Sequence, residues 1–483
     1  MSAPTPQAEQ AEQARQTEAA GGTEPPRLAR TPDAAAAPVR IVHLGLGNFF
    51  RAHQAWYTMR AGDGWGIAAF TGRRPDVART LAPQDGLYTL VERGPDGDDV
   101  GVVTSLSAVH AAGDQAAWLG YLRDPAVAVV TSTVTEAGYL RGHDGGLDAA
   151  HPDVAADVAT LRRDPVAPVT TVPAKIVAGL LARQGADAGP ITVLPCDNLP
   201  GNGAVVGRVV RDLAALVDPD LLPWIAENVD FASSMVDRIT PDVAPGTAEI
   251  VERELGVVDA SPVVTEPFSQ WVVAGSFPAG RPRWEDAGVE LVDDVEPYER
   301  RKLLLLNGAH SLMAYAGPIL GHETVDAAFA DERVRAWVEQ LWDDAETDLD
   351  ERVRARTPAY RQALRERFGN VRMSDVLGRI AADGSQKLPV RHVPVLLARR
   401  SAGEVSAGAV VGVAAWIAHL RGAGVPVRDV AADLWRERAA GEDEGAVARI
   451  LASLAPELAE DAGLPEVHRA VLAQLRAFEQ PEV

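Results

Sequence analysis

Apolar and polar positions alternate in two different ways along this chain. In the first part, short β-branched runs are each followed by a stretch with helical spacing. These runs occupy residues 39–45, 66–72, 127–135 and 191–198. Strands that alternate with helices are typical of βαβ units and predict a parallel sheet. We therefore predict an α/β domain over residues 39–290, less regular after residue 229.

The pattern changes near Tyr298. From there on, long Ala-, Leu- and Arg-rich segments are interrupted by Gly and Pro, which predicts a mostly α-helical second domain over residues 291–483. Residues 1–38 carry neither the apolar core of a signal peptide nor an Arg-rich transit sequence. They are interpreted as a disordered tail.

Composition narrows the classes of partner. The 483 residues exceed the size that one core usually organises, in agreement with two domains. A net charge of −22 opposes binding to nucleic acid and to anionic membranes, and no apolar run approaches the ~18 residues that span a bilayer. The single cysteine, Cys196, excludes an internal disulfide and leaves no Cys cluster for zinc. We expect a cytoplasmic, metal-independent protein with a small-molecule partner.

The first strand ends in a candidate phosphate-binding turn. It runs directly into Gly45 and Gly47, followed by Asn48 and Phe49 at the start of a predicted helix. Such a turn lets the backbone approach a dinucleotide pyrophosphate at a helix N-terminus. The third glycine of the usual fingerprint is replaced by Phe50, so an ordinary tight turn is the alternative.

The end of the second strand bears on the choice of cofactor. An acidic residue about 20 positions after the glycines normally binds the ribose of NAD, and the first one here is Asp76. We predict NAD, with Asp76 near the ribose. Arg73 and Arg74 would suit the 2′-phosphate of NADP, which stays open, although two loop arginines are often only solvated.

A second chemical signal lies in the helix predicted after residue 297. At 100° per residue, Glu299, Lys302, Asn307 and His310 fall within an arc of about 140°. Apolar residues surround them, so the helix should be buried. A desolvated lysine has a lowered pKa and serves as a general base near neutral pH. The alternative is a lysine that reaches solvent from a helix end, beside a core histidine.

Together these segments resemble the polyol-specific long-chain dehydrogenases, the mannitol dehydrogenase family. The likeness covers about residues 39 to 480. Its motifs are GLGNFFRAHQA at 45–55, TEAGY at 135–139, CDNLPGNG at 196–203, MVDRITP at 235–241, TEPFSQWV at 265–272, and the helix with Lys302, Asn307 and His310. The resemblance implies a Rossmann-type parallel sheet domain followed by a mostly helical domain.

The resemblance also implies roles for individual residues. Lys302 matches the family's general base, and Asn198 and Asn307 match two amides that hold the reacting oxygen. His310 matches a substrate-orienting imidazole, and Glu299 matches a carboxylate thought to pass the proton to solvent. From the residues alone, Asn198 could instead cap the helix that begins near residue 203.

Three further residues match groups that bind the remaining substrate oxygens: Asp237, Arg379 and Lys387. Each has a simpler interpretation. Asp237 and the adjacent Arg238 could form a structural ion pair, and Arg379 and Lys387 would otherwise be surface charges.

The implied reaction is hydride transfer between a nicotinamide cofactor and a sugar alcohol or 2-ketose, with mannitol and fructose as the favoured pair. Fructuronate or mannitol 1-phosphate are alternatives, in which Arg379, Lys387 and Arg391 would pair with an anionic terminus. A nucleotide-binding regulator without catalysis would have lost Lys302 or the two asparagines, which are all present. We expect a monomer or a weak homo-oligomer.

Overall fold

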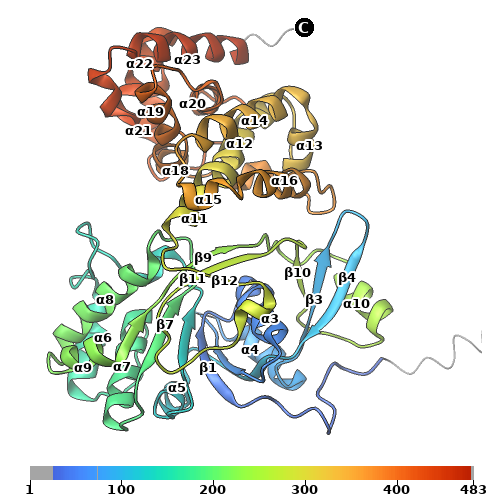
Figure 1. Cartoon of the computed structure of the whole chain (residues 1–483), viewed down its shortest axis with the longest axis vertical. Helices are drawn as coiled ribbons and strands as arrows, with labels where there is room; N and C mark the ends of the chain where they lie inside the picture. The colour runs from blue at the N-terminus through green and yellow to red at the C-terminus, as the bar shows by residue number, and fades with distance from the viewer. Residues whose placement is uncertain (1–24, 73, 480–483) are drawn as a thin grey trace, which may run out of the picture.

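A computed structural model describes residues 25–72 and 74–479 and divides into a sheet domain and a helical domain (Figure 1). The main sheet has six parallel strands in the order β5-β2-β1-β6-β7-β8. These strands are β1 (Val39–Leu44), β2 (Gly66–Phe70), β5 (Leu106–His110), β6 (Val129–Ser132), β7 (Ile191–Pro195) and β8 (Val229–Phe231). The predicted α/β fold with a parallel sheet is confirmed.

Helices connect these strands, as the alternation of apolar runs predicts. They are α2 (Asn48–Ala52), α3 (Gln54–Ala61), α4 (Asp76–Leu81), η1 (Ala82–Gln84), α5 (Gln115–Leu122), η2 (Glu136–Tyr139), α6 (Pro152–Arg163), α7 (Val172–Gly185), α8 (Asn202–Val217) and α9 (Leu221–Asn228). The strands β2 and β7 are buried along their whole length, because helices and loops cover the sheet on both faces.

Two three-stranded sheets complete this domain. One has the order β10-β3-β4 and the other β12-β11-β9. Their strands are β3 (Tyr88–Arg93), β4 (Asp98–Val103), β9 (Ser233–Asp237), β10 (Val263–Thr265), β11 (Gln270–Ala274) and β12 (Glu290–Leu291), with α10 (Thr247–Leu255) and η3 (Trp284–Ala287) beside them. The irregular region expected after residue 229 is thus a second layer of short strands, which carries Val236 and Asp237 toward the helical domain (Figure 1).

The second domain is helical throughout, as predicted. A continuous helix enters it as α11 (Glu296–Arg301), η4 (Lys302–Asn307) and α12 (Gly308–Ile319). The others are α13 (Val325–Ala330), α14 (Glu332–Glu346), α15 (Glu351–Arg354), α16 (Thr357–Phe368), α17 (Leu377–Ile380), α18 (Gly384–Arg391), α19 (Val393–Ser401), α20 (Ala407–Leu420), α21 (Ala432–Ala439), α22 (Asp443–Leu454), η5 (Pro456–Glu460) and α23 (Leu464–Glu479).

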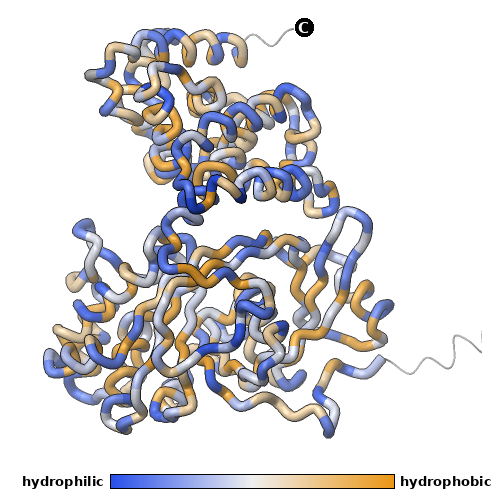
Figure 2. Tube along the Cα trace, viewed as in Figure 1, coloured by the Kyte–Doolittle hydropathy of each residue, from blue (hydrophilic) through white to orange (hydrophobic). Residues whose placement is uncertain are grey.

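The helical core forms around α20 and α12. From Gly408 to Leu420 every residue of α20 is buried, as expected for a helix that is apolar on all sides. Figure 2 shows the same principle over the whole chain, with apolar positions along the strands and inner helices and polar positions at the outer turns. The segments that precede α12 in the same continuous helix, α11 and η4, line a cavity at the boundary between the two domains.

The expected disordered tail is wrong where the structure describes it. Residues 1–24 lie outside the described residues, but residues 25–38 run along the sheet domain. The Leu28 side chain is buried, and its backbone N–H donates to the carbonyl of Val258. Arg30 donates to the carbonyls of Thr104 and Leu106 at 2.8 and 2.7 Å. These partners are distant in sequence, so no local pattern indicated the ordering.

Candidate active site

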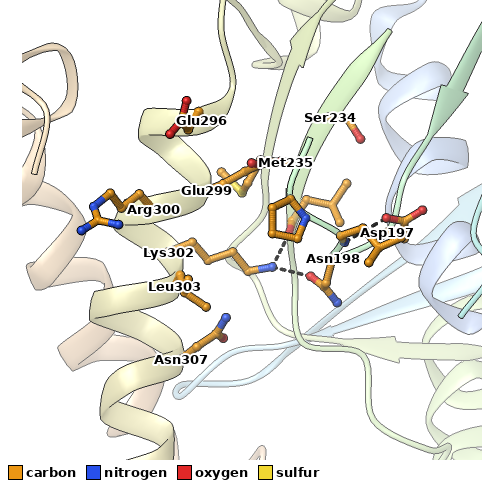
Figure 3. Close-up of a pocket in the computed structure, with 13 residues that line it drawn as sticks. Asp197, Asn198, Ser234, Met235, Glu296, Glu299, Arg300, Lys302, Leu303 and Asn307 are labelled. Atoms are coloured by element: carbon orange, nitrogen blue, oxygen red, sulfur yellow. Dashed lines mark hydrogen bonds between the residues drawn. The ribbon is translucent and has the colours of Figure 1, made fainter. Parts of the chain in front are cut away.

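The lysine helix contains one widened turn. Over Lys302–Asn307 it is a π-helix, and the N–H of Gly308 donates to the carbonyl of Leu303, five residues back. In a regular α-helix, Lys302 and Asn307 would point about 140° apart. A turn closed between residues five apart brings them to the same side of the helix. Figure 3 shows both side chains pointing toward the loop that carries Asn198.

Lys302 is held by two acceptors from the sheet domain. Its Nζ donates to Oδ1 of Asn198 at 2.7 Å and to the carbonyl of Val236 at 2.6 Å (Figure 3). Burial lowers the pKa of Lys302, and the nearby Asp237 carboxylate opposes that shift only in part. No sequence pattern pointed to Val236, because it contributes a backbone carbonyl, which every residue type has.

Asn198 does not cap a helix. Helix α8 begins at Asn202, with Gly201 at the capping position and no side-chain cap. Asn198 instead lines a cavity of about 190 Å³ between the two domains. The polar side chains at that cavity include Asn198, Lys302, Asn307 and Glu299. Four of the five residues predicted to be catalytic therefore converge there.

Glu299 lies one turn before Lys302 and closes the outer side of the cavity. Its carboxylate accepts from the backbone N–H of Gly201 at 3.1 and 3.2 Å. Burial raises the pKa of Glu299 to about 7, against the opposite effect of the Gly201 N–H. A carboxyl group that titrates near neutrality can both accept and release a proton at working pH.

His310, the fifth predicted catalytic residue, lies on α12 beyond Asn307. Its Nε2 is buried and has no hydrogen-bond partner in the described part of the chain. Burial lowers the pKa of His310 to about 3, so the imidazole is neutral at physiological pH. A buried ring nitrogen without a partner suits a ligand hydroxyl.

A second cavity, of about 490 Å³, adjoins the first at Asn198 and Val236. It lies at the carboxyl ends of the parallel strands, where nucleotides bind in open α/β sheets. Thr133 to Ala137 after β6, Cys196 after β7 and Phe49 on α2 line it.

The glycine turn fits a dinucleotide. Gly45 has φ of +110°, and a Cβ there would lie 2.4 Å from the carbonyl oxygen of Thr133. Gly47 stands at the start of α2, with free space beside its Cα except for one contact at 3.6 Å. The backbone of this turn is therefore accessible at a helix N-terminus, as a pyrophosphate requires.

Of the other residues predicted to bind the cofactor, some line the larger cavity and others do not. Phe49 lines the larger cavity, and Oδ1 of Asn48 accepts from Arg51 within α2. Asp76 begins α4, is exposed and pairs with Arg79 at 3.6 Å; it lines neither cavity. Arg73 lies outside the described residues.

Asp237 forms an ion pair, but with a residue other than Arg238. Both its oxygens accept from Arg367 on α16, at 2.8 and 2.9 Å, and Arg367 also binds Glu266. Burial would raise the pKa of Asp237, and Arg367 outweighs it, so the pKa is lowered. Arg238 pairs with Glu92 instead. Sequence reasoning missed Arg367, since nothing separates it from other arginines of its helix.

The remaining substrate-binding candidates lie on α17 and α18. Arg379 is exposed and pairs with Asp375 at 2.6 Å. Lys387 is partly buried and donates to the carbonyl of Ile380 at 3.0 Å, while Arg391, one turn on, donates to the carbonyl of Asn307 and to Ser311. Arg391 therefore contacts the continuous helix that carries Lys302 and Asn307. The Arg379 side chain is directed to the carboxylate of Asp375 instead.

The described residues contain neither a metal-binding cluster nor a helix that could span a membrane. Within residues 25–72 and 74–479, no three His, Cys, Asp or Glu side chains gather closely enough to bind a metal ion. Among the helices in those same ranges, none combines the length and the apolar character needed to cross a membrane.

The sheet topology and the cavity at the carboxyl ends of the parallel strands are those of a nicotinamide-dependent dehydrogenase, and comparison with known proteins gives its family. The mannitol dehydrogenase Rossmann domain model matches residues 39–286, and the mannitol dehydrogenase C-terminal domain model matches residues 294–473. The chain belongs to the mannitol dehydrogenase family, as its motifs indicated. Residues 287–293 lie between the two models.

Individual relatives agree over most of the chain. Mannitol 2-dehydrogenase of Cereibacter sphaeroides is 38% identical over 79% of this chain and 81% of its own. D-mannonate oxidoreductase of Escherichia coli is 37% identical over 79% of this chain and 80% of its own. The solved structure of Pseudomonas fluorescens mannitol 2-dehydrogenase with NAD and D-mannitol superposes with a TM-score of 0.75, at 33% identity and 95% coverage of each chain.

Proposed function

We propose that this protein is an NAD-dependent polyol dehydrogenase that interconverts a sugar alcohol and its 2-ketose, with mannitol and fructose as the favoured pair. One observation carries the proposal. The amine of Lys302 lies at the junction of the two cavities, within hydrogen-bond distance of Asn198 and beside Asn307. A base beside two amides can remove the proton of a secondary alcohol and stabilise the charge that develops on its oxygen.

The hydrogen bonds of Lys302 suit it to remove the hydroxyl proton. A neutral amine has two N–H groups and one lone pair. The two N–H groups are used by Oδ1 of Asn198 and the carbonyl of Val236, so the lone pair is left for the substrate. In ketose reduction the same amine, protonated, returns the proton to the carbonyl oxygen.

The asparagine amides complete the pocket for the reacting oxygen. Because Oδ1 of Asn198 accepts from Lys302, its NH₂ group is free to donate. Asn307 lines the same cavity on the same side of the helix as Lys302. Donors fixed in advance around a developing oxyanion are usually the largest single contribution to such a reaction. Glu299 then passes the proton from Lys302 toward solvent.

The cofactor belongs in the larger cavity. Gly45, Gly47 and the N-terminus of α2 would hold its pyrophosphate, and Thr133 to Ala137 would flank its nicotinamide end. When bound, that ring accepts the hydride from carbon 2 of the polyol. We favour NAD because the related mannitol 2-dehydrogenase was solved with it. The exposed Asp76 remains the proposed partner of the ribose, and it has to leave Arg79 to reach it.

A second candidate substrate is fructuronate, whose terminal carboxylate distinguishes it from fructose. Lys387 and Arg391 lie one turn apart on α18, and neither has an ion-pair partner among the described residues. Two partly buried cations of this kind would bind a carboxylate directly. The similarity to D-mannonate oxidoreductase points the same way.

The deciding experiment is a reductase screen. Fructose, fructuronate, tagaturonate, xylulose and fructose 6-phosphate are each tested with NADH and with NADPH. We expect fructose with NADH to have the highest kcat/KM. A preference of about a hundredfold or more for fructuronate over fructose would select the second candidate. No reduction of any ketose would refute the proposed function.

A further inference from the structure

A buried tyrosine and aspartate lie beneath the loop that carries Asn198. Tyr139, the last residue of η2, is fully buried, and its hydroxyl donates to Oδ2 of Asp197 at 2.6 Å. Asp197 lines both cavities, and Figure 3 shows it directly beside Asn198. A hydrogen bond from a phenol to a carboxylate in a buried setting is short and strong.

The Asp197 carboxylate fixes the backbone on either side of Asn198. Its second oxygen, Oδ1, accepts from the N–H of Leu199 at 3.0 Å, which closes a turn over residue 198. Its own carbonyl accepts from the Asn202 side chain at 3.4 Å. The residues before and after Asn198 are therefore tied down, and with them the direction in which the Asn198 side chain leaves the chain.

Asn198 itself has little else to orient it. The residue is exposed, and within the described part of the chain its side chain has one hydrogen bond, the one to Lys302. A side chain with little packing takes its direction from its backbone and from its hydrogen bonds. The orientation of this amide therefore depends on Lys302 and on the backbone that Asp197 holds, and Asp197 is in turn bonded to Tyr139.

Tyr139 also connects this loop to the cofactor side. Residues 135–137, immediately before it, line the larger cavity. Burial raises the pKa of Tyr139 well above its usual value, and the Asp197 carboxylate adds to this, so the phenol keeps its proton and remains the donor.

We propose that Tyr139 and Asp197 are a positioning pair that aims the Asn198 amide at the reacting oxygen. This inference rests on the proposed function, because the amide matters only if an oxyanion develops beside Lys302. It makes Tyr139 act through Asn198 and through no other catalytic group. Removing the phenol hydroxyl should therefore cost nothing once Asn198 has been truncated.

A double-mutant cycle tests this dependence. Asn198→Ala should lower kcat for ketose reduction by about 10²-fold to 10³-fold, the usual cost of one oxyanion donor. Tyr139→Phe, which keeps the ring, should lower kcat by about tenfold or more through misalignment of that donor. The double variant should match Asn198→Ala within about threefold. Losses that multiply in the double variant would overturn the inference.

A matched control separates positioning from general loss of stability. Tyr88 is equally buried, and its hydroxyl donates to the carbonyl of Arg51 at 2.7 Å. Tyr88→Phe should leave kcat within about threefold of the wild type, although it loses a comparable hydrogen bond. The dissociation constant for NADH, measured by fluorescence quenching, should be the same for Tyr139→Phe and the wild type. A weakened NADH complex that accounts for the whole loss of activity would contradict the inference.

A second variant covers a failure to fold. If Tyr139→Phe does not fold, Asp197→Asn, which keeps the shape of the side chain and can accept only one of the two hydrogen bonds, replaces it in the same cycle. The wild type is assayed first with the ketose panel. An inactive wild type refutes the proposed function, whereas an active wild type with independent effects of Tyr139 and Asn198 refutes only the positioning pair.

Discussion

Replacement of Lys302 by alanine tests the centre of the proposed mechanism. The variant loses the base and also the donor to Asn198 and Val236. General base catalysis contributes about 10²-fold to 10⁴-fold. Because the released Asn198 amide also loses its orientation, we expect the upper end, a fall in kcat of about 10⁴-fold, equivalent to about 5.4 kcal/mol in the barrier.

The assay follows NADH absorbance during ketose reduction, under single-turnover conditions so that product release does not hide the chemical step. The variant should fold, because the two acceptors left behind border a cavity that admits water. Added methylamine should restore part of the rate, in proportion to its concentration, by occupying the space of the missing amine.

The outcome that refutes the reasoning is retained activity. A folded Lys302→Ala variant with about a tenth of the wild-type kcat at neutral pH would mean that the proton is transferred by another group. A control variant, Lys175→Ala, removes another lysine whose pKa is lowered by burial, one that donates to the carbonyl of Ala112 and lines neither cavity. It should leave kcat within about threefold.

The remaining predictions concern Glu299, the glycine turn and metals. The pKa of Glu299 is raised from near 4.5 to about 7, so the contribution of Glu299 to stability is complete below pH 4.5 and is lost as the pH rises through 7. The difference in Tm between the wild type and Glu299→Gln should therefore shift against the wild type between pH 4.5 and 7. A Tm difference that stays constant over this range would contradict the prediction. Gly45→Ala, whose Cβ would lie 2.4 Å from the Thr133 carbonyl, should cost about 1–3 kcal/mol in thermal unfolding and weaken NADH binding. Gly113→Ala, with no atom within 4 Å of the new Cβ, is its control and should change neither. Dialysis against a strong chelator should leave activity intact, and a loss reversed by zinc would refute metal independence.

The sequence was informative wherever a local rule applies. The β-branched runs became β1, β2, β6 and β7 because strand formation and burial follow short-range patterns. The turn at Gly45 was recognisable because only glycine tolerates a φ of +110° that close to another backbone. The apolar helix around Lys302 was recognisable for a similar reason, since burial of a lysine on a leucine-rich helix is a local property of the sequence.

Tertiary structure alone decided which groups meet. Asp237 is paired with Arg367, 130 positions away, and not with its neighbour Arg238, because α16 and β9 pack across the domain boundary. The segment around Leu28 is ordered by partners at least 55 positions later in the chain, among them Val258. Ion pairs and surface segments form with whichever residues lie near them in space. The distances between residues far apart in the chain cannot be read from a single sequence.

Tertiary structure also decided how Lys302, Asn307 and Asn198 are aligned. A helical wheel of 3.6 residues per turn separates Lys302 from Asn307, and they are brought together by the π-turn over Lys302–Asn307, in which the N–H of Gly308 donates to the carbonyl of Leu303. The loop with Asn198 reaches Lys302 only because β7 ends at the domain boundary. Residue types and their order thus determined the chemistry available to this protein, and the packing of its two domains determined which of those groups meet at one cavity, because their distances are set by contacts between segments about a hundred residues apart.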